Sequence, residues 1–132
     1  MIRVASMVLV VRSLERALVI WETGLGLAPT GPPRNVSSIG AWQIFLRADN
    51  LSLELLEPHD HAKPAGRFLA ARGEGLFALA LAVEDADAAR ARLAAHGVSA
   101  LAVAEGPEGE RWYLRPADAH GILVELTRAP AE

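Results

Sequence analysis

The segment Leu-Ser-Leu-Glu-Leu-Leu-Glu-Pro, residues 51–58, places Glu54 between leucines in a short apolar run. The segment Gly-Ile-Leu-Val-Glu-Leu-Thr, residues 121–127, repeats this arrangement with Glu125. Short apolar runs without helical spacing are typical of buried strands, so both glutamates are predicted to lie in strands. Removing a carboxylate from water costs several kcal/mol unless a cation, a hydrogen-bond network or a raised pKa compensates. These two glutamates are therefore the first candidates for a functional site.

The composition favours one folded domain without nucleic-acid or membrane partners. The chain has 132 residues, 52% of them hydrophobic and 22% charged, which suits a compact domain with a sizeable core. Its net charge of −3 and its lack of a basic block argue against nucleic acid. No apolar stretch approaches the length of a membrane span. The absence of cysteine excludes disulfides and thiolate metal sites and leads us to expect a cytoplasmic protein.

The first half of the chain predicts a strand, a helix and then further strands. β-branched runs indicate strands, and a serine before an apolar helical stripe indicates a helix start. A stretch rich in Pro, Gly, Asn and Ser indicates a loop. The predicted elements are a strand at Val4–Val11, a helix that begins after Ser13 and ends by Gly24 and Gly26, a loop at Thr30–Ser38, and strands at Ala41–Arg47 and Leu51–Leu56.

The second half repeats this order. It predicts a strand at Leu76–Val83, a helix capped by Asp85 or Asp87 that ends at His96-Gly97, strands at Val98–Ala104, Arg111–Arg115 and Ile122–Thr127, and a turn at Gly106–Gly109. A linker, residues 59–75, contains a short helix around Gly66–Ala71. The sequence thus predicts a single α+β domain over residues 1–132, with tandem βαβββ modules at about 1–58 and 76–128. The modules are expected to form a curved, half-open mixed sheet around a cavity.

Several motifs together resemble the vicinal oxygen chelate superfamily, which includes glyoxalase I, methylmalonyl-CoA epimerase, extradiol dioxygenases and the fosfomycin and bleomycin resistance proteins. The motifs are Ser-Leu-Glu-Arg-Ala at 13–17, Gly-Leu-Gly-Leu at 24–27, Glu-Leu-Leu-Glu-Pro at 54–58, Gly-Glu-Gly-Leu at 73–76 and Gly-Ile-Leu-Val-Glu-Leu at 121–126. The epimerase-like branch is the most similar. The resemblance covers almost the entire chain, but one scaffold of this kind serves many chemistries.

The resemblance also implies where a metal would bind, because relatives hold one with a side chain from each of four strands. The two carboxylate positions fall at Glu54 and Glu125, whereas the two histidine positions fall at Ser6 and Ala78. Zinc, cobalt and nickel favour imidazole ligands, so we expect no resident metal or other cofactor. A weak divalent ion such as Mg²⁺ or Mn²⁺ at Glu54 and Glu125 stays open.

Without a metal, the glutamates could still act as acid and base. A carboxylate with a raised pKa in a dry pocket can abstract a proton α to a carbonyl. The developing anion would then need another electrophile, for which the candidates are Arg47, Arg111, Arg115, Trp42, Gln43 and Tyr113. The alternative is structural: both glutamates pair with an arginine, or with Ser6 and Tyr113.

Two tryptophans occupy central strands of the two modules. Trp42 and Trp112 could form walls of a binding cavity and stack on a flat ligand. Core packing or a dimer interface is the alternative. Strand alternation puts Trp42 and Ile44 on one face and Gln43 on the other, but it does not say which face lines the cavity.

These observations leave two functional hypotheses. The first is a metal-independent isomerase or lyase for a carbonyl or acyl-thioester substrate, with Glu54 and Glu125 as catalytic residues. The second is a non-catalytic binding protein of the bleomycin-resistance type. In both, the expected partner is a small molecule contacted by Ser6, Trp42, Ala78, Trp112 and Tyr113. The resemblance further implies a homodimer.

Overall fold

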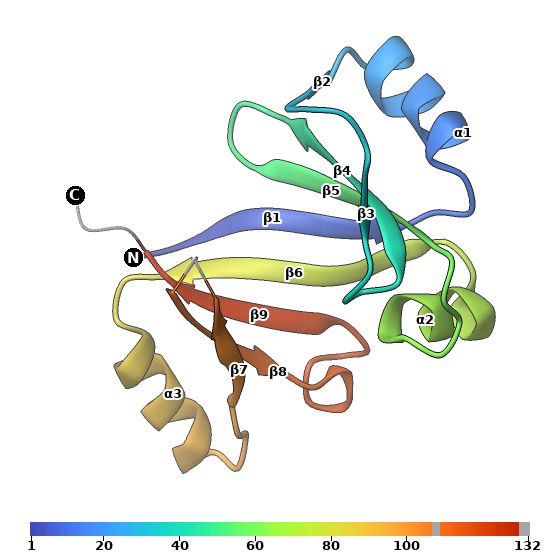
Figure 1. Cartoon of the computed structure of the whole chain (residues 1–132). Helices are drawn as coiled ribbons and strands as arrows, with labels where there is room; N and C mark the ends of the chain where they lie inside the picture. The colour runs from blue at the N-terminus through green and yellow to red at the C-terminus, as the bar shows by residue number, and fades with distance from the viewer. Residues whose placement is uncertain (107–108, 130–132) are drawn as a thin grey trace. The chain divides into compact units, whose positions relative to one another are not determined.

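A computed structural model of the chain describes residues 1–106 and 109–129, which fall into two compact units (Figure 1). The N-terminal unit is Ser6–Phe77, and the C-terminal unit combines Met1–Ala5 with Ala78–Glu132. Each unit contains parallel and antiparallel strand pairs and a helix that packs on them. The predicted α+β class and its tandem βαβββ modules are therefore confirmed.

The N-terminal unit carries strands in the order β2-β4-β5-β1, with β3 also paired to β4. The parallel β1–β5 pair and the antiparallel β4–β5 pair make β5 a central strand. Its elements are β1 (Ile2–Val10), whose residues up to Ala5 belong to the C-terminal unit, α1 (Leu14–Leu18), the π-helix η1 (Val19–Gly24), β2 (Ala28–Pro29), β3 (Arg34–Val36), β4 (Ala41–Arg47), β5 (Ser52–Pro58) and α2 (Pro64–Arg72).

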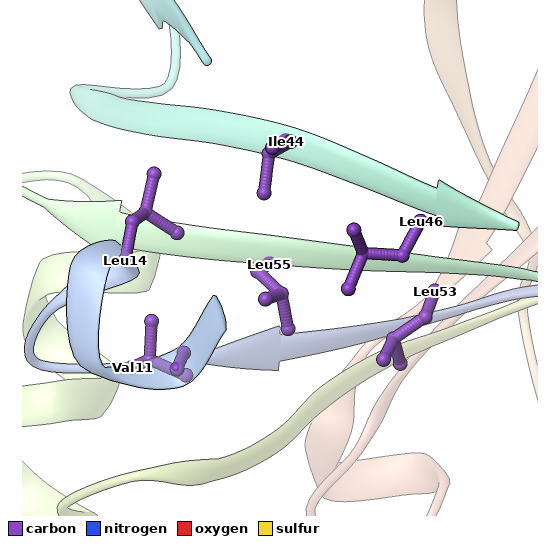
Figure 2. Close-up of a cluster of buried hydrophobic side chains, with 7 residues drawn as sticks. Val11, Leu14, Ile44, Leu46, Leu53 and Leu55 are labelled. Atoms are coloured by element: carbon purple, nitrogen blue, oxygen red, sulfur yellow. The ribbon is translucent and has the colours of Figure 1, made fainter. Parts of the chain in front are cut away.

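Helix α1 begins where two side-chain oxygens accept its first N–H groups. Ser13 has extended backbone angles, and its hydroxyl accepts a hydrogen bond from the Arg16 N–H at 3.2 Å. The carboxylate of Glu57 accepts one from the Leu14 N–H at 2.9 Å. The apolar side of the helix then packs on β4 and β5, as Figure 2 shows. The buried residues of this cluster are Val11, Leu14, Ala17, Ile44, Leu46, Leu53 and Leu55.

The C-terminal unit orders its later strands β6-β9-β8-β7. Its elements are β6 (Gly75–Val83), α3 (Ala86–Ala95), β7 (Leu101–Gly106), β8 (Gly109–Leu114), the 3-10 helix η2 (Pro116–Asp118) and β9 (Leu123–Arg128). Asp85 caps α3, because its carboxylate accepts a hydrogen bond from the Ala88 N–H at 2.9 Å. The buried side chains beside this helix are Val83, Ala86, Trp112 and Leu126.

Several sequence-based boundaries were wrong. The predicted loop at Thr30–Ser38 contains β3, which pairs with the outer side of β4 despite the prolines before it. The strand expected from Val98 begins at Leu101. The helix after Ser13 changes to π geometry at Val19. The predicted turn at Gly106–Gly109 includes residues outside the described part of the chain, and the linker helix is α2. Within the described residues, no helix is long and apolar enough to cross a membrane.

Candidate functional site

Strand pairing assigns the side chains of the N-terminal sheet to two faces. Glu54 of β5 is paired with Val8 of β1 and with Phe45 of β4, so these three side chains project from one face. We call it the carboxylate face of the N-terminal unit. Alternation and pairing add further polar residues to it: Ser6, Arg34, Gln43, Arg47 and Ser52. The opposite face, which packs against α1, is the helix face.

Glu54 is thus held away from the apolar cluster under α1, although leucines flank it in the sequence. Its neighbours Leu53 and Leu55 project to the helix face and are buried there. Glu54 itself is partly buried. The alternation explains how one apolar strand can present a carboxylate without placing it in the core.

The C-terminal sheet repeats this arrangement around Glu125. Glu125 of β9 is paired with Ala80 of β6 and with Tyr113 of β8, so these side chains share the carboxylate face of the C-terminal unit. Ala78, two residues before Ala80, lies on the same face and is buried. Glu125 and Tyr113 are partly buried. The structure therefore brings together three of the predicted site residues within one unit.

The two tryptophans lie on the helix faces of their units. Trp112 is 4% exposed and packs with Val83, Ala86 and Leu126 under α3. Trp42 alternates with Gln43 and therefore shares the face of Ile44, and it is 41% exposed. Neither side chain lies on the carboxylate face of its own unit. By register, moreover, Trp112 corresponds to Ile44, since each is paired with the residue that follows the site glutamate.

Two arginines flank the indole ring of Trp112. The guanidinium carbons of Arg90 and Arg128 lie 4.6 and 5.1 Å from the ring centroid. Arg128 also donates hydrogen bonds to Glu110 and Asp87, and these bonds raise the pKa of Arg128. Such cation–π contacts stabilise the packing of Trp112 on the helix side of this sheet. Trp112 is therefore packed as part of the buried cluster under α3.

The donor set at the four positions implied for a metal does not fit a zinc-like ion. Ser6 and Glu54 share the carboxylate face of one unit, and Ala78 and Glu125 share that of the other. A methyl group and a hydroxyl stand where imidazoles would be needed. Among residues 1–106 and 109–129, no cluster of three or more His, Cys, Asp or Glu side chains is arranged to hold an ion.

Three of the histidines, His59, His96 and His120, lie outside the strands. His59 is exposed, and its Nε2 lies 2.8 Å from the side-chain oxygen of Asn35. His96 forms the C-cap of α3, where its backbone N–H donates a hydrogen bond to the Leu93 carbonyl at 3.0 Å. His120 adopts a left-handed turn with φ of 62° before the last strand. Each of these histidines thus serves a loop or a helix end.

The N-terminal unit contains two cavities. One of about 350 Å³ lies on the helix side of the sheet, with Arg12, Ser13, Arg16, Ile20, Trp21 and Glu74 in its lining. The other, of about 300 Å³, is lined by residues that include Thr30, Gly31, Pro32, Arg34, Gln43 and Phe45. Because Gln43 and Phe45 belong to the carboxylate face, the second cavity adjoins the candidate site. We call it the Arg34 cavity. Sequence reasoning missed Arg34 because it assigned this segment to a loop.

Comparisons of the sequence and of the fold with known proteins point to one superfamily. Residues 7–113 match the sequence profile of the Glyoxalase/Bleomycin resistance protein/Dioxygenase superfamily. A hypothetical protein from Bacillus halodurans is 26% identical, covers 99% of this chain and 98% of its own, and superposes with a TM-score of 0.81. Methylmalonyl-CoA epimerase from Mycobacterium tuberculosis is 25% identical, with coverages of 98% and 89% and a TM-score of 0.78.

A methylmalonyl-CoA epimerase solved with methylmalonyl-CoA and NH4+ is also 25% identical, with coverages of 98% and 95% and a TM-score of 0.79. No curated protein is significantly similar in sequence. The profile match spans most of the chain, and the solved relatives superpose over nearly all of it. This chain therefore belongs to the glyoxalase/bleomycin resistance protein/dioxygenase superfamily.

Proposed function

We propose that this protein is an isomerase for acyl-CoA thioesters. It removes the proton from the carbon α to the thioester carbonyl and returns a proton to the same carbon. The observation that carries the proposal is the pairing of Glu125 with Tyr113 on the carboxylate face of the C-terminal unit. A carboxylate beside a phenol combines a proton acceptor with a hydrogen-bond donor, which are the two groups that enolate formation needs. The similarity to methylmalonyl-CoA epimerases, one of them solved with its thioester, supports the substrate class.

The proposed reaction consists of two proton transfers. One glutamate takes the α-proton, the C–H electron pair moves into the thioester to form an enolate, and the Tyr113 hydroxyl donates a hydrogen bond to the enolate oxygen. The other glutamate returns a proton to the opposite side of the α-carbon, which inverts its configuration. Glu125 and Glu54 are the proposed acid and base, and Ser6 and Ala78 are proposed ligand contacts. This scheme needs no metal.

The alternative is a binding protein that grips its ligand between Trp42, Trp112 and the carboxylates. The placement of both tryptophans on helix faces favours the isomerase instead. Ligand contacts by these two residues, a homodimeric state and a cytoplasmic location remain predictions.

Solvent exchange of the α-proton tests the proposal directly. The protein is incubated with methylmalonyl-CoA and with other α-branched acyl-CoA thioesters in D2O, and α-deuteration is followed by NMR. Wild-type protein treated with a chelator should catalyse the exchange, whereas Glu125→Gln and Glu54→Gln should lower its rate by about 10²-fold or more. Glu22→Gln, a change at an exposed glutamate on η1, is the matched control and should keep the wild-type rate.

If thioesters bind without exchange in the wild-type protein, the binding-protein alternative is correct. Exchange that survives in both site variants would instead remove the glutamates from the mechanism. Thermal stabilisation by each thioester, measured on the same samples, separates binding from turnover.

A further inference from the structure

A paired arginine and glutamine form one wall of the Arg34 cavity. Arg34 of β3 and Gln43 of β4 are directly opposed, and the Arg34 Nη2 donates a hydrogen bond to the Gln43 Oε1 at 3.1 Å. Gln43 is only 9% exposed, so its polar group has been removed from water and fixed in orientation. A guanidinium has five N–H donors, and this bond uses one of them. The rest can bind a ligand.

The charge of the lining favours an anion. Arg34 contributes a positive charge, and no acidic side chain is among the described residues that line the cavity. The Arg34–Gln43 bond holds the guanidinium in place, so part of the cost of ordering it is met before a ligand arrives. Arginine presents a planar fork that matches a carboxylate or a phosphate. The cavity therefore suits a carboxylate or phosphate group.

The loop that forms the other side of the cavity is held in position as well. The Thr30 N–H donates a hydrogen bond to the Phe45 carbonyl at 3.0 Å. Pro32, whose ring fixes its φ angle, follows directly after Gly31. A rim tied to β4 and stiffened by proline keeps the cavity open without a ligand, which lowers the entropic cost of binding.

The cavity is lined by Gln43 and Phe45 of the carboxylate face and by Ile44, the residue between them on β4. Gln43 is two residues from Phe45 along β4, which corresponds to roughly 7 Å of strand. Phe45 in turn is paired with Glu54. An anion held by Arg34 would thus belong to a ligand that passes the ring of Phe45 on its way to the carboxylate.

We infer that the Arg34 cavity is an anion subsite that binds a carboxylate or phosphate of the ligand, with Arg34 as the binding residue and Gln43 as the residue that positions it. The inference adds a specificity site to the proposed function and rests on that function for the identity of the whole ligand. The anion has two sources in an acyl-CoA: a carboxylate on the acyl group, or a phosphate of coenzyme A. Both use the same contacts with the guanidinium.

Small anions test the subsite without any turnover. Isothermal titration at low ionic strength should show that wild-type protein binds malonate or phosphate but not the neutral malonamide. Arg34→Gln should weaken anion binding by about tenfold or more, since a charge-assisted hydrogen bond is lost. Arg92→Gln is the matched control, because Arg92 is an exposed arginine on α3 outside the cavity lining. It should bind like wild type.

A second variant tests the subsite even if the Arg34→Gln protein does not fold. Gln43→Glu leaves Arg34 in place but gives it an internal carboxylate partner, so it should also lose malonate binding. Thermal unfolding reports whether each variant is folded. If wild-type protein binds neither anion, or if folded Arg34→Gln binds as wild type does, the subsite is refuted. Malonate binding in a protein without α-proton exchange would leave the subsite standing while the isomerase proposal fails.

Matched thioesters then identify the source of the anion. Succinyl-CoA and butyryl-CoA have the same chain length and differ in a terminal carboxylate. If Arg34→Gln weakens succinyl-CoA alone, the acyl carboxylate occupies the subsite. If it weakens both equally and leaves a butyryl-pantetheine thioester unaffected, a phosphate of coenzyme A occupies it. Either pattern supports the anion subsite, and no change for any of the three contradicts it.

Discussion

Tyr113 lies directly opposite Glu125 on the β8–β9 ladder, in the register position where Phe45 lies opposite Glu54. Both modules therefore present a glutamate beside an aromatic ring. Only the C-terminal ring carries a hydroxyl, so the two carboxylates have chemically different neighbours. The proposed acid and base therefore differ in the side chain that lies opposite each of them.

Tyr113→Phe should slow α-proton exchange more than it weakens substrate binding. The hydroxyl is expected to act on the charge that develops in the transition state, and loss of one such donor typically costs about 10²–10³ in kcat. The measurement is kcat and KM for exchange of an α-branched acyl-CoA. Phe45→Leu, which removes a ring but no hydroxyl, should mainly raise KM. An unchanged kcat in Tyr113→Phe would remove the phenol from the proposed chemistry.

Trp112→Leu should destabilise the fold, whereas Trp42→Leu should have a small effect. Trp112 is buried under α3 and flanked by Arg90 and Arg128, so truncation should cost about 3 kcal/mol or more. Urea unfolding gives both values. Ligand affinity, measured well below the unfolding midpoint, should stay within about twofold of wild type in both variants. A larger loss of affinity in a stable Trp42→Leu variant would show that Trp42 contacts the ligand.

Glu57→Ala should lower stability without affecting the chemistry. Its carboxylate accepts a hydrogen bond from the Leu14 N–H at the start of α1, a contact worth about 1–2 kcal/mol. Ser13→Ala should cost a similar amount for the same reason. Chemical denaturation provides the measurement. Exchange by folded Glu57→Ala should equal that of wild type, which separates this glutamate from Glu54; slower exchange in folded protein would place Glu57 in the reaction.

Ala78→His should create affinity for cobalt or zinc. The new imidazole would lie on the carboxylate face shared with Glu125, and these ions favour nitrogen ligands. Titration with Co²⁺, followed by absorption spectroscopy, should show binding that wild-type protein lacks. The double variant Ala78→His with Glu125→Gln is the control and should lose most of this gain. Tight cobalt binding by wild-type protein would contradict our interpretation of Ser6 and Ala78.

The sequence predicted the fold because the strands carry their own periodicity. Around Glu54 and Glu125, leucines and other aliphatic residues indicate strands, and Ser13 and Asp85 mark helix starts through their side-chain oxygens. The repeat of the pattern then gives the modular order. β3 was missed because a three-residue edge strand has too few residues for a periodic signal, and its pairing depends on β4.

The candidate site was predicted less completely, for a similar reason. Alternation separates Trp42 from Gln43, but only the position of α1 says which face is covered by a helix. The sequence places Trp42 and Trp112 in central strands of their modules, whereas strand pairing aligns Trp112 with Ile44. The bond between Arg34 and Gln43 joins two strands, and a single sequence does not contain that register.

The first strand also limits where this chain can be divided into fragments. Met1–Ala5 group with Ala78–Glu132, and the Met1 carbonyl accepts a hydrogen bond from the Glu84 N–H at 3.0 Å. Recombination at the boundary between the repeats would therefore leave the N-terminal product with a strand segment, Met1–Ala5, that belongs to the C-terminal unit. The two modules have the same order of elements, but they cannot be exchanged as independent fragments. A split reporter or chimera divided at residue 77 should assemble only when both pieces are present.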